Sequence, residues 1–341
     1  MKLAISIGPI DPVNLESTTA FVRHAEALGV DYAWSHEAWG TDAVTPIAYL
    51  AAKTERIKLG SGIIQISTRT PAMIAMTALT LDVLSQGRFV LGLGTSGPQV
   101  IEGLHGLPYA GALSRLRETV DIITQGLNGE KLNYKGRYHE LPLPDGEGKS
   151  LRLDFASRPE MPIYLATLGP RALEYTGARA AGWLGTSFSP EHADAHLAYI
   201  AQGAKDAGRD ISDIDLQVGC HVAIGDDVEG LIGERKKAVA FSLGAMGSAQ
   251  TNFYNDAYRR AGFEDDARAV QSLWLAGKRE AAVARVPDAL VTQFAAVGTE
   301  EMVKERFQDY RAAGVNCLHC RFEGTTQSNK YEILERIFEM L

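Results

Sequence analysis

Residues of the types that carry protons follow the second apolar run of the chain. The segment 34–42 reads Trp-Ser-His-Glu-Ala-Trp-Gly-Thr-Asp, so His36 and Glu37 are adjacent and Trp39 follows closely. An imidazole and a carboxylate can each move a proton to or from a reacting group, and an indole offers a ligand a flat apolar wall. A loop whose tryptophan packs and whose glutamate caps a backbone group is an equal alternative from these residues alone.

Three segments rich in glycine also stand at the ends of apolar runs. Gly60 and Gly62 lie in the third run, the segment 92–98 reads Gly-Leu-Gly-Thr-Ser-Gly-Pro, and the segment 167–171 reads Thr-Leu-Gly-Pro-Arg. Glycine at a strand end indicates a bulge or a close approach of a ligand. Bare N–H groups at a helix N-terminus, with one arginine, predict an anion site at 167–171, although Gly-Pro also begins helices for conformational reasons.

Short apolar runs alternate with amphipathic stretches along the whole chain. This alternation favours the α/β class and a closed (β/α)8 TIM barrel, whose site lies at the carboxyl ends of the strands. A doubly wound open sheet is the alternative, but the loop 8–12 lacks the glycine fingerprint of a dinucleotide fold. We predict strands at 3–7, 32–34, 57–64, 88–93, 162–166, 183–186, 216–223 and 315–322, and helices at 14–28, 46–53, 71–84, 113–127, 171–181, 190–207 and 331–340.

Two segments exceed what a minimal barrel needs. One covers about 128–160 and contains a predicted hairpin at 134–138, and the other covers about 226–287 and is helical by pattern. Long insertions after strands usually build the mouth of a site. Neither has the pattern of an independent domain, so we expect a single domain over 1–341.

Composition excludes several classes of function. The chain has 341 residues, 45% hydrophobic and 22% charged, with a net charge of −8. A large core is therefore possible, and binding to nucleic acid or to a membrane surface is not expected. No apolar run approaches the roughly 20 residues that span a bilayer, and residues 1–5 enter a strand without a signal-peptide pattern, so we expect a cytoplasmic protein.

Metal and disulfide chemistry are not expected. The eight histidines are scattered, and strand 3–7 carries neither histidine nor carboxylate, which leaves too few ligands for a metal hydrolase. Three cysteines cannot form a disulfide framework. Cys317 and Cys320 stand three residues apart in a predicted strand, which places their thiols on opposite faces of the sheet.

These segments together resemble the bacterial luciferase-like monooxygenase superfamily, and more closely its deazaflavin-dependent oxidoreductases. The resemblance covers nearly the whole chain. It rests on the segments 35–42 (Ser-His-Glu-Ala-Trp-Gly-Thr-Asp), 59–65, 87–99 and 163–170, and 244–263 is similar to the insertion of the methylene-tetrahydromethanopterin reductase branch.

The resemblance implies an oxidoreductase, in homodimers, that moves a hydride between coenzyme F420 and a small organic substrate. It also implies a cis peptide between Gly62 and Ile63. An FMN-dependent monooxygenase and a barrel that binds a ligand without catalysis are the alternatives. The positions expected to bind the cofactor are Gly62, Ile63, Gln65, Thr95, Ser96, Gly97, Thr167, Gly169, Pro170 and Arg171.

The chain departs from the family pattern at two places. Many members carry an acid followed by histidine after strand two, whereas here Glu37 is followed by Ala38 and preceded by His36, so either Glu37 or His36 is the expected proton carrier. The glucose-6-phosphate dehydrogenase branch has a lysine near the end of strand six, where this chain has no cation between 185 and 189. We therefore expect a neutral or apolar substrate that contacts Trp39, Thr186 and Phe188.

Overall fold

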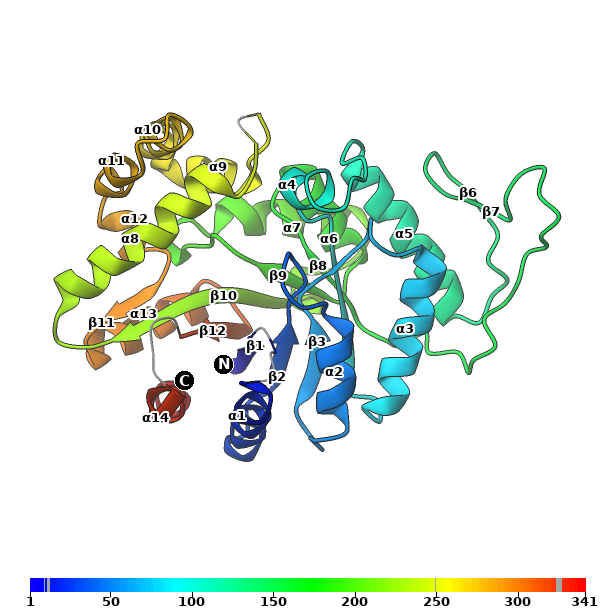
Figure 1. Ribbon diagram of the computed structural model, residues 1–341, viewed down its shortest axis with the longest axis horizontal. Helices are drawn as coiled ribbons and strands as arrows, with labels where there is room; N and C mark the ends of the chain where they lie inside the picture. The colour runs from blue at the N-terminus through cyan, green and yellow to red at the C-terminus, as the bar shows by residue number, and fades with distance from the viewer. Residues whose placement is uncertain (9, 11–12, 249, 323–326) are drawn as a thin grey trace.

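The computed structural model describes residues 1–341 except 9, 11–12, 249 and 323–326. In the described part of the chain, eight parallel strands close into a barrel, which Figure 1 shows surrounded by helices. Each strand pairs with the next, β12 returns to β1, and β9 pairs with β10. The predicted TIM barrel is confirmed. The strands are β1 (Lys2–Ile7), β2 (Tyr32–Ser35), β3 (Lys58–Ser61), β5 (Phe89–Gly94), β8 (Ile163–Ala166), β9 (Gly182–Gly185), β10 (Asp215–Ile224) and β12 (Cys317–Arg321).

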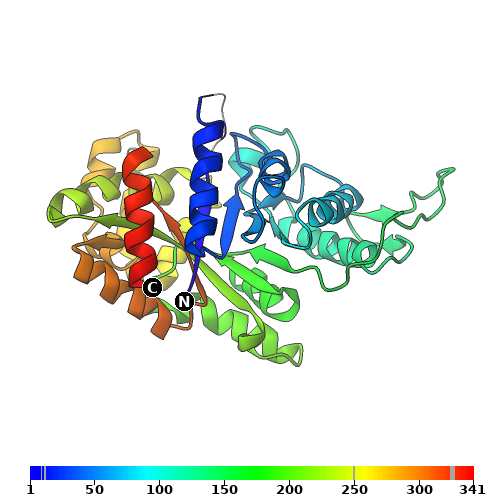
Figure 2. The same ribbon diagram turned by 90° about the horizontal axis from the view of Figure 1, so that it is seen from below.

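Helices cover the outside of the barrel, and the first and last of them, α1 and α14, lie side by side near the termini (Figure 2). Local sequence explains several of their ends. Gly29 ends α1 in the left-handed region, with φ 99°, and the Thr70 hydroxyl accepts a hydrogen bond from the Met73 amide at the start of α3. These helices are α1 (Leu15–Leu28), α2 (Val44–Ala51), α3 (Pro71–Leu84), α5 (Ala112–Leu127), α6 (Pro170–Arg179), α7 (Asp194–Asp206), α13 (Glu300–Ala312) and α14 (Gln327–Met340).

Strand alternation fills the barrel interior with layers of side chains. At the amino-terminal end, the hydroxyls of Tyr32 and Tyr164 donate hydrogen bonds to Asp215, at 3.1 and 2.7 Å. In the next layer the buried Trp34 donates its indole N–H to Gln217 at 3.1 Å. The Trp34 ring lies over Gly60, where an added Cβ would come within 2.2 Å of it. Glycine at this position is therefore explained by packing.

The predicted strand 57–64 is interrupted. β3 ends at Ser61, a cis peptide joins Gly62 to Ile63, and β4 (Ile64–Gln65) then pairs with β5. The Ser61 hydroxyl donates to the Gly92 carbonyl and accepts from the Gly92 amide, both at 2.9 Å. The cis peptide that the resemblance implied is present.

The first insertion is a projecting arm. The predicted hairpin forms from β6 (Tyr134–Lys135) and β7 (Glu140–Leu141), which pair antiparallel away from the barrel (Figure 1). The Glu118 carboxylate on α5 accepts hydrogen bonds from the amides of residues 137, 138 and 139 at 2.8 to 2.9 Å. This contact ties the arm to the body of the protein.

The second insertion is helical, as predicted, and has an apolar cluster of its own. Beyond its predicted end at about 287, a strand that sequence reasoning did not anticipate, β11 (Ala296–Gly298), pairs with β10 outside the barrel. The short α4 (Pro98–Ile101) and α13 were also not anticipated. The helical part contains α8 (Val228–Ala245), α9 (Phe253–Tyr258), a π-helical turn (Arg259–Phe263), α10 (Glu264–Leu275), α11 (Arg279–Ala284) and α12 (Ala289–Thr292).

The cysteines of β12 face opposite sides, as their spacing predicted. Cys317 packs inside the barrel with Trp34 and Tyr164, whereas Cys320 belongs to the layer between barrel and helices. Among the described residues, no helix combines the length and apolar composition needed to cross a bilayer.

Candidate active site

A cavity of about 1360 Å³ lies where the barrel strands end at their carboxyl side. Its walls come from the loops after β2, β3, β5 and β8, from β9 and β12, and from the second insertion through α8 and α9. Single ligand pockets usually measure about 300 to 1,000 Å³. The cavity therefore has room for a large cofactor together with a substrate.

Most of the site residues predicted from sequence meet at this cavity. Loops that are remote in the chain supply them, because parallel barrel strands all end on the same side. The predicted residues on its wall are His36, Glu37, Trp39, Gly62, Ile63, Thr95, Ser96, Gly97, Thr167, Gly169, Pro170, Arg171 and Thr186.

Two predicted residues lie elsewhere. Gln65 is fully buried and donates its side-chain amide to the backbone carbonyls of Glu37 and Ala38, so it supports the loop after β2 instead of contacting a cofactor. Phe188 is 1% exposed and packs against Trp183 and His196 in the core. The structure therefore does not bring Phe188 to the cavity, where the predicted contact with substrate would be made, because the chain turns it towards the outer helices after β9.

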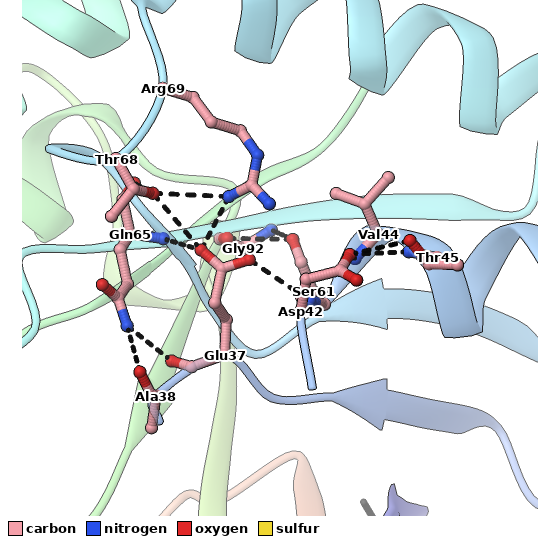
Figure 3. Close-up of polar contacts among 11 residues, drawn as sticks. Glu37, Ala38, Asp42, Val44, Thr45, Ser61, Gln65, Thr68, Arg69 and Gly92 are labelled. Carbon is pink, nitrogen blue, oxygen red and sulfur yellow. Dashed lines mark hydrogen bonds and ion pairs between the residues drawn. The ribbon is translucent and has the colours of Figure 1, made fainter. Parts of the chain in front are cut away.

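Glu37 reaches the cavity, but protein groups occupy its carboxylate (Figure 3). One oxygen pairs with Arg69 at 2.7 Å and accepts a hydrogen bond from the Gln65 amide at 3.3 Å. The other oxygen accepts from the Ala43 amide at 3.2 Å. These contacts join the loop after β2, the loop after β4 and the start of α2, so the geometry favours a positioning role for Glu37 over proton transfer.

His36 stands in a hydrogen-bonded row with two residues of other strands. Its Nδ1 lies 2.5 Å from the Gly62 carbonyl oxygen, and its Nε2 lies 3.1 Å from the Ser6 hydroxyl. The same hydroxyl lies 2.7 Å from Nε2 of His319. The two imidazole rings are stacked, with centroids 5.4 Å apart.

The N-terminus of α6 lies on the cavity wall, at the position where an anion site is predicted. Gly169 caps the helix with φ −76°, Pro170 and Arg171 open its first turn, and all three line the cavity. Pro170 has no N–H, and the amides of Ala172 and Leu173 donate to the Gly169 carbonyl. The N–H groups of Gly169 and Arg171 are therefore the ones that this positive end of the helix offers to an anion. An added Cβ at Gly169 would meet no protein atom within 4 Å. This opening leaves room for a ligand group against the bare backbone.

The loop after β5 forms a second part of the wall. Ser96 has a left-handed φ of 56°, and its carbonyl accepts a hydrogen bond from the Tyr109 hydroxyl at 3.1 Å. Burial raises the pKa of Tyr109, so its hydroxyl stays protonated and can donate this bond. Sequence reasoning missed Tyr109, since nothing in its segment marks a site.

Other wall residues were also missed. Ser6 occupies an inward position near the end of β1, and strand alternation from Ala4 could have found it. The others on the wall include Met246, Phe253, Tyr254 and Arg321.

No group of histidine, cysteine and carboxylate side chains suited to a metal occurs in the part of the chain that the structure describes.

Burial keeps several histidines neutral. Burial, followed by the charge of Arg321, lowers the pKa of His36 to about 4. Burial and Arg260 lower that of His196 to about 3. His196 packs against Trp183 and Phe188, and its ring nitrogens have no hydrogen-bond partner among the described residues.

These shifts predict a loss of stability in mild acid. The unfolded chain takes up protons near pH 6.5, before the folded chain does, so the free energy of unfolding falls as the pH drops from about 7 towards 4. His196→Phe should remove about 2 kcal/mol of the loss between pH 7 and pH 5. Denaturant unfolding of both proteins at each pH measures the difference, and parallel pH curves would refute the assignment.

Comparisons with known proteins agree with this geometry. The sequence matches the luciferase-like monooxygenase family over residues 4–317. It is 35% identical to a Mycobacterium tuberculosis protein assigned as a coenzyme F420-dependent oxidoreductase (Rv3520c), over 93% of this chain and 94% of that protein. It is 28% identical to the 5,10-methylenetetrahydromethanopterin reductase of Methanopyrus kandleri, over 86% and 85% of the two chains.

Solved structures confirm the fold. The coenzyme F420-dependent tetrahydromethanopterin reductase of Methanopyrus kandleri superposes with a TM-score of 0.81 at 23% identity, over 100% of this chain and 98% of that one. An F420-dependent secondary alcohol dehydrogenase superposes with a TM-score of 0.73 at 16% identity, over 100% and 99%. The chain belongs to the luciferase-like monooxygenase family.

Proposed function

We propose that this protein is an oxidoreductase that transfers a hydride between coenzyme F420 and a small organic substrate. The observation that carries the proposal is the open space in front of the Gly169 backbone at the start of α6. This space lies on the wall of a cavity large enough for two ligands. The 35% identity to a protein assigned as F420-dependent supports the choice of cofactor.

The wall residues fit such a cofactor. The backbone N–H groups of Gly169 and Arg171, together with the Arg171 guanidinium, would hold its phosphate, because each attracts an anion. The backbone at Gly62 and Ile63 and the loop at 95–97 would bound its ring, since these residues line the cavity at the strand ends. When bound, a deazaflavin supplies a carbon that accepts or gives a hydride. The chain then has to orient the substrate, exclude water and move the accompanying proton.

The neutral or apolar substrate predicted from sequence has support in the aromatic rim. Trp39 is 64% exposed at the cavity, and Phe253 and Phe241 stand on the wall supplied by the insertion. The carboxylate of Glu37 is compensated by Arg69. We propose that an apolar part of the substrate lies along this rim.

The reaction is tested by following the visible absorbance of oxidised F420. The protein is mixed with F420 and a panel of secondary alcohols, and in the reverse direction reduced F420 is mixed with enones and ketones. Bleaching or recovery of the absorbance with at least one panel member is the expected result. Consumption of oxygen with reduced FMN, and no change with F420, would instead favour a monooxygenase.

We also propose that two copies of the chain associate through α3. Apart from Thr77, Thr80 and Asp82, this helix consists of apolar residues spread around its circumference, and a helix of that kind is usually buried. Met73 and Met76 are nevertheless about half exposed in the isolated chain, as are Val83 and Leu84 further along the helix. A second copy of the same face would cover them.

The dimer is tested with a charge in the apolar face. Met76→Glu should shift the molar mass measured by light scattering from that of a dimer to that of a monomer, because an unpaired carboxylate is costly to bury. Leu275→Glu, at an exposed apolar residue at the end of α10, is the matched control and should remain dimeric. A monomeric wild type, or a dimeric Met76→Glu protein, would contradict the proposal.

A further inference from the structure

Three inward-facing side chains meet at the top of the barrel. Ser6 lies on β1 and His319 on β12, and these strands are neighbours, whereas His36 follows β2 on the other side of β1. Ser6 Oγ therefore lies between the two imidazoles, 3.1 Å from His36 Nε2 and 2.7 Å from His319 Nε2.

The Gly62 carbonyl determines where the protons of this row lie. A carbonyl oxygen can only accept a hydrogen bond, so the Nδ1 atom of His36, 2.5 Å away, must carry a hydrogen. In the neutral ring Nε2 then has a lone pair and accepts from the Ser6 hydroxyl. The Ser6 oxygen in turn accepts from an N–H at Nε2 of His319. The row therefore runs in one direction, from His319 through Ser6 to His36.

Counting the donors and acceptors of this row shows which hydrogen-bonding position remains for a ligand. Both ring nitrogens of His36 are occupied, by Gly62 and by Ser6. A serine hydroxyl has one donor and two acceptor positions. Ser6 uses the donor towards His36 and one acceptor towards His319, so one acceptor position remains. Ser6 lines the cavity, whereas His319 lies behind it and is 7% exposed.

We propose that Ser6 is a catalytic residue that exchanges a proton with a ligand hydroxyl in the cavity, that His36 stores this proton, and that His319 positions Ser6. This inference rests on the proposed function. In the oxidising direction the O–H bond of the substrate breaks as its proton passes to Ser6 Oγ. The proton of Ser6 passes to Nε2 of His36, which becomes an imidazolium with N–H bonds at both nitrogens. Two protons move along the row, and the net result is the transfer of one proton from the substrate to His36; the hydride, with its electron pair, would go to a bound deazaflavin as the oxidant.

The surroundings of His36 keep its ring neutral, which is the form that can accept a proton. The groups that face it are the Arg321 guanidinium and the His319 ring from β12, the Ser6 hydroxyl from β1 and the Gly62 carbonyl after β3. Burial and the charge of Arg321 lower its pKa, so the ring is neutral at pH 7. A neutral ring can accept the proton of an alcohol. The reducing direction should be favoured by acidic conditions, because it begins from the protonated ring.

The hydrogen positions are tested on the free protein. Nuclear magnetic resonance with isotopically labelled histidine distinguishes the two neutral tautomers, and the variants His36→Gln and His319→Gln assign the signals. We expect His36 to carry its hydrogen at Nδ1 and His319 at Nε2. A hydrogen at Nε2 of neutral His36 would overturn the proposal. This readout needs no cofactor, so it stays decisive even where F420 fails to bind and the proposed function fails.

The role of Ser6 is tested with three variants of the complete protein and one control variant. Ser6→Ala should lower kcat for alcohol oxidation by at least about tenfold, with the F420 dissociation constant within twofold of the wild type. Ser114→Ala, at an exposed serine of α5, is the matched control. His319→Leu should lower kcat as Ser6→Ala does, whereas His319→Gln keeps an N–H donor and should recover part of the rate. A Ser6→Ala enzyme with wild-type kcat and an unchanged pH profile would overturn the proposal.

Discussion

Gly169→Leu is expected to weaken the binding of F420 by more than tenfold, which corresponds to about 1.4 kcal/mol. The native φ of −76° is open to any residue, and an added Cβ meets no protein atom within 4 Å. The variant should therefore fold normally. Its side chain would occupy the space in front of the first N–H groups of α6, where the phosphate of the cofactor is proposed to lie.

Fluorescence titration of F420 into the wild type and the variant measures the effect. Gly148→Leu is the matched control, because an added Cβ at Gly148 is also free of protein contacts, in an exposed loop that does not contribute to the cavity wall. This control should bind F420 as the wild type does. Equal affinity of Gly169→Leu and wild type would exclude the start of α6 from the cofactor site.

Asp215→Ala should destabilise the protein by roughly 3 to 5 kcal/mol, since it removes the charged acceptor at the centre of a partly buried network and leaves its donors without a partner. One oxygen of Asp215 accepts from Tyr32, Tyr164 and the Gln217 amide, at 3.1, 2.7 and 2.9 Å, and the other pairs with Lys2 at 3.3 Å. Burial alone would raise the pKa of Asp215, but the hydrogen bonds from Gln217 and Tyr164 hold it below its usual value.

Unfolding in urea, followed by circular dichroism, measures this loss. Asp215→Asn keeps one carbonyl oxygen and should lose less than Asp215→Ala. Asp154→Ala, at an exposed position in the arm, should stay within about 0.5 kcal/mol of the wild type. A loss below 1 kcal/mol in Asp215→Ala would show that water replaces the carboxylate and that the network contributes little.

The fold could be predicted because its signals are local. Each barrel strand is a short apolar run and most outer helices have clear starts and ends, such as Gly29 after α1. β11 could not be found in this way, because three residues are too few to show the alternation of apolar and polar residues that marks a strand. Only their pairing with the extended β10 makes them a strand. The cis peptide between Gly62 and Ile63 was implied by the family resemblance, whereas the break that it makes between β3 and β4 was not predicted, because the pattern of apolar residues continues through it.

The part of the candidate site that directly follows the barrel strands was predictable, because the site of a TIM barrel lies at the carboxyl ends of its strands. Residues directly after β2, β3, β5 and β8 reach the cavity, as that rule predicts. Gln65 and Phe188 do not reach the cavity wall, because position along the chain does not decide which way a side chain turns. The row of Ser6 and His319 was missed for a different reason. Each residue is ordinary within its own strand, and only the closure of the barrel places β12 beside β1.

The central claim is that the cavity binds a deazaflavin, and calorimetric titration of the apoprotein with F420 and, separately, with FMN under identical conditions tests it most directly. We predict saturable binding of F420 with one site per chain, and binding of FMN at least about tenfold weaker, a difference of about 1.4 kcal/mol. Tighter binding of FMN than of F420, or no binding of F420 to folded protein, would contradict the account.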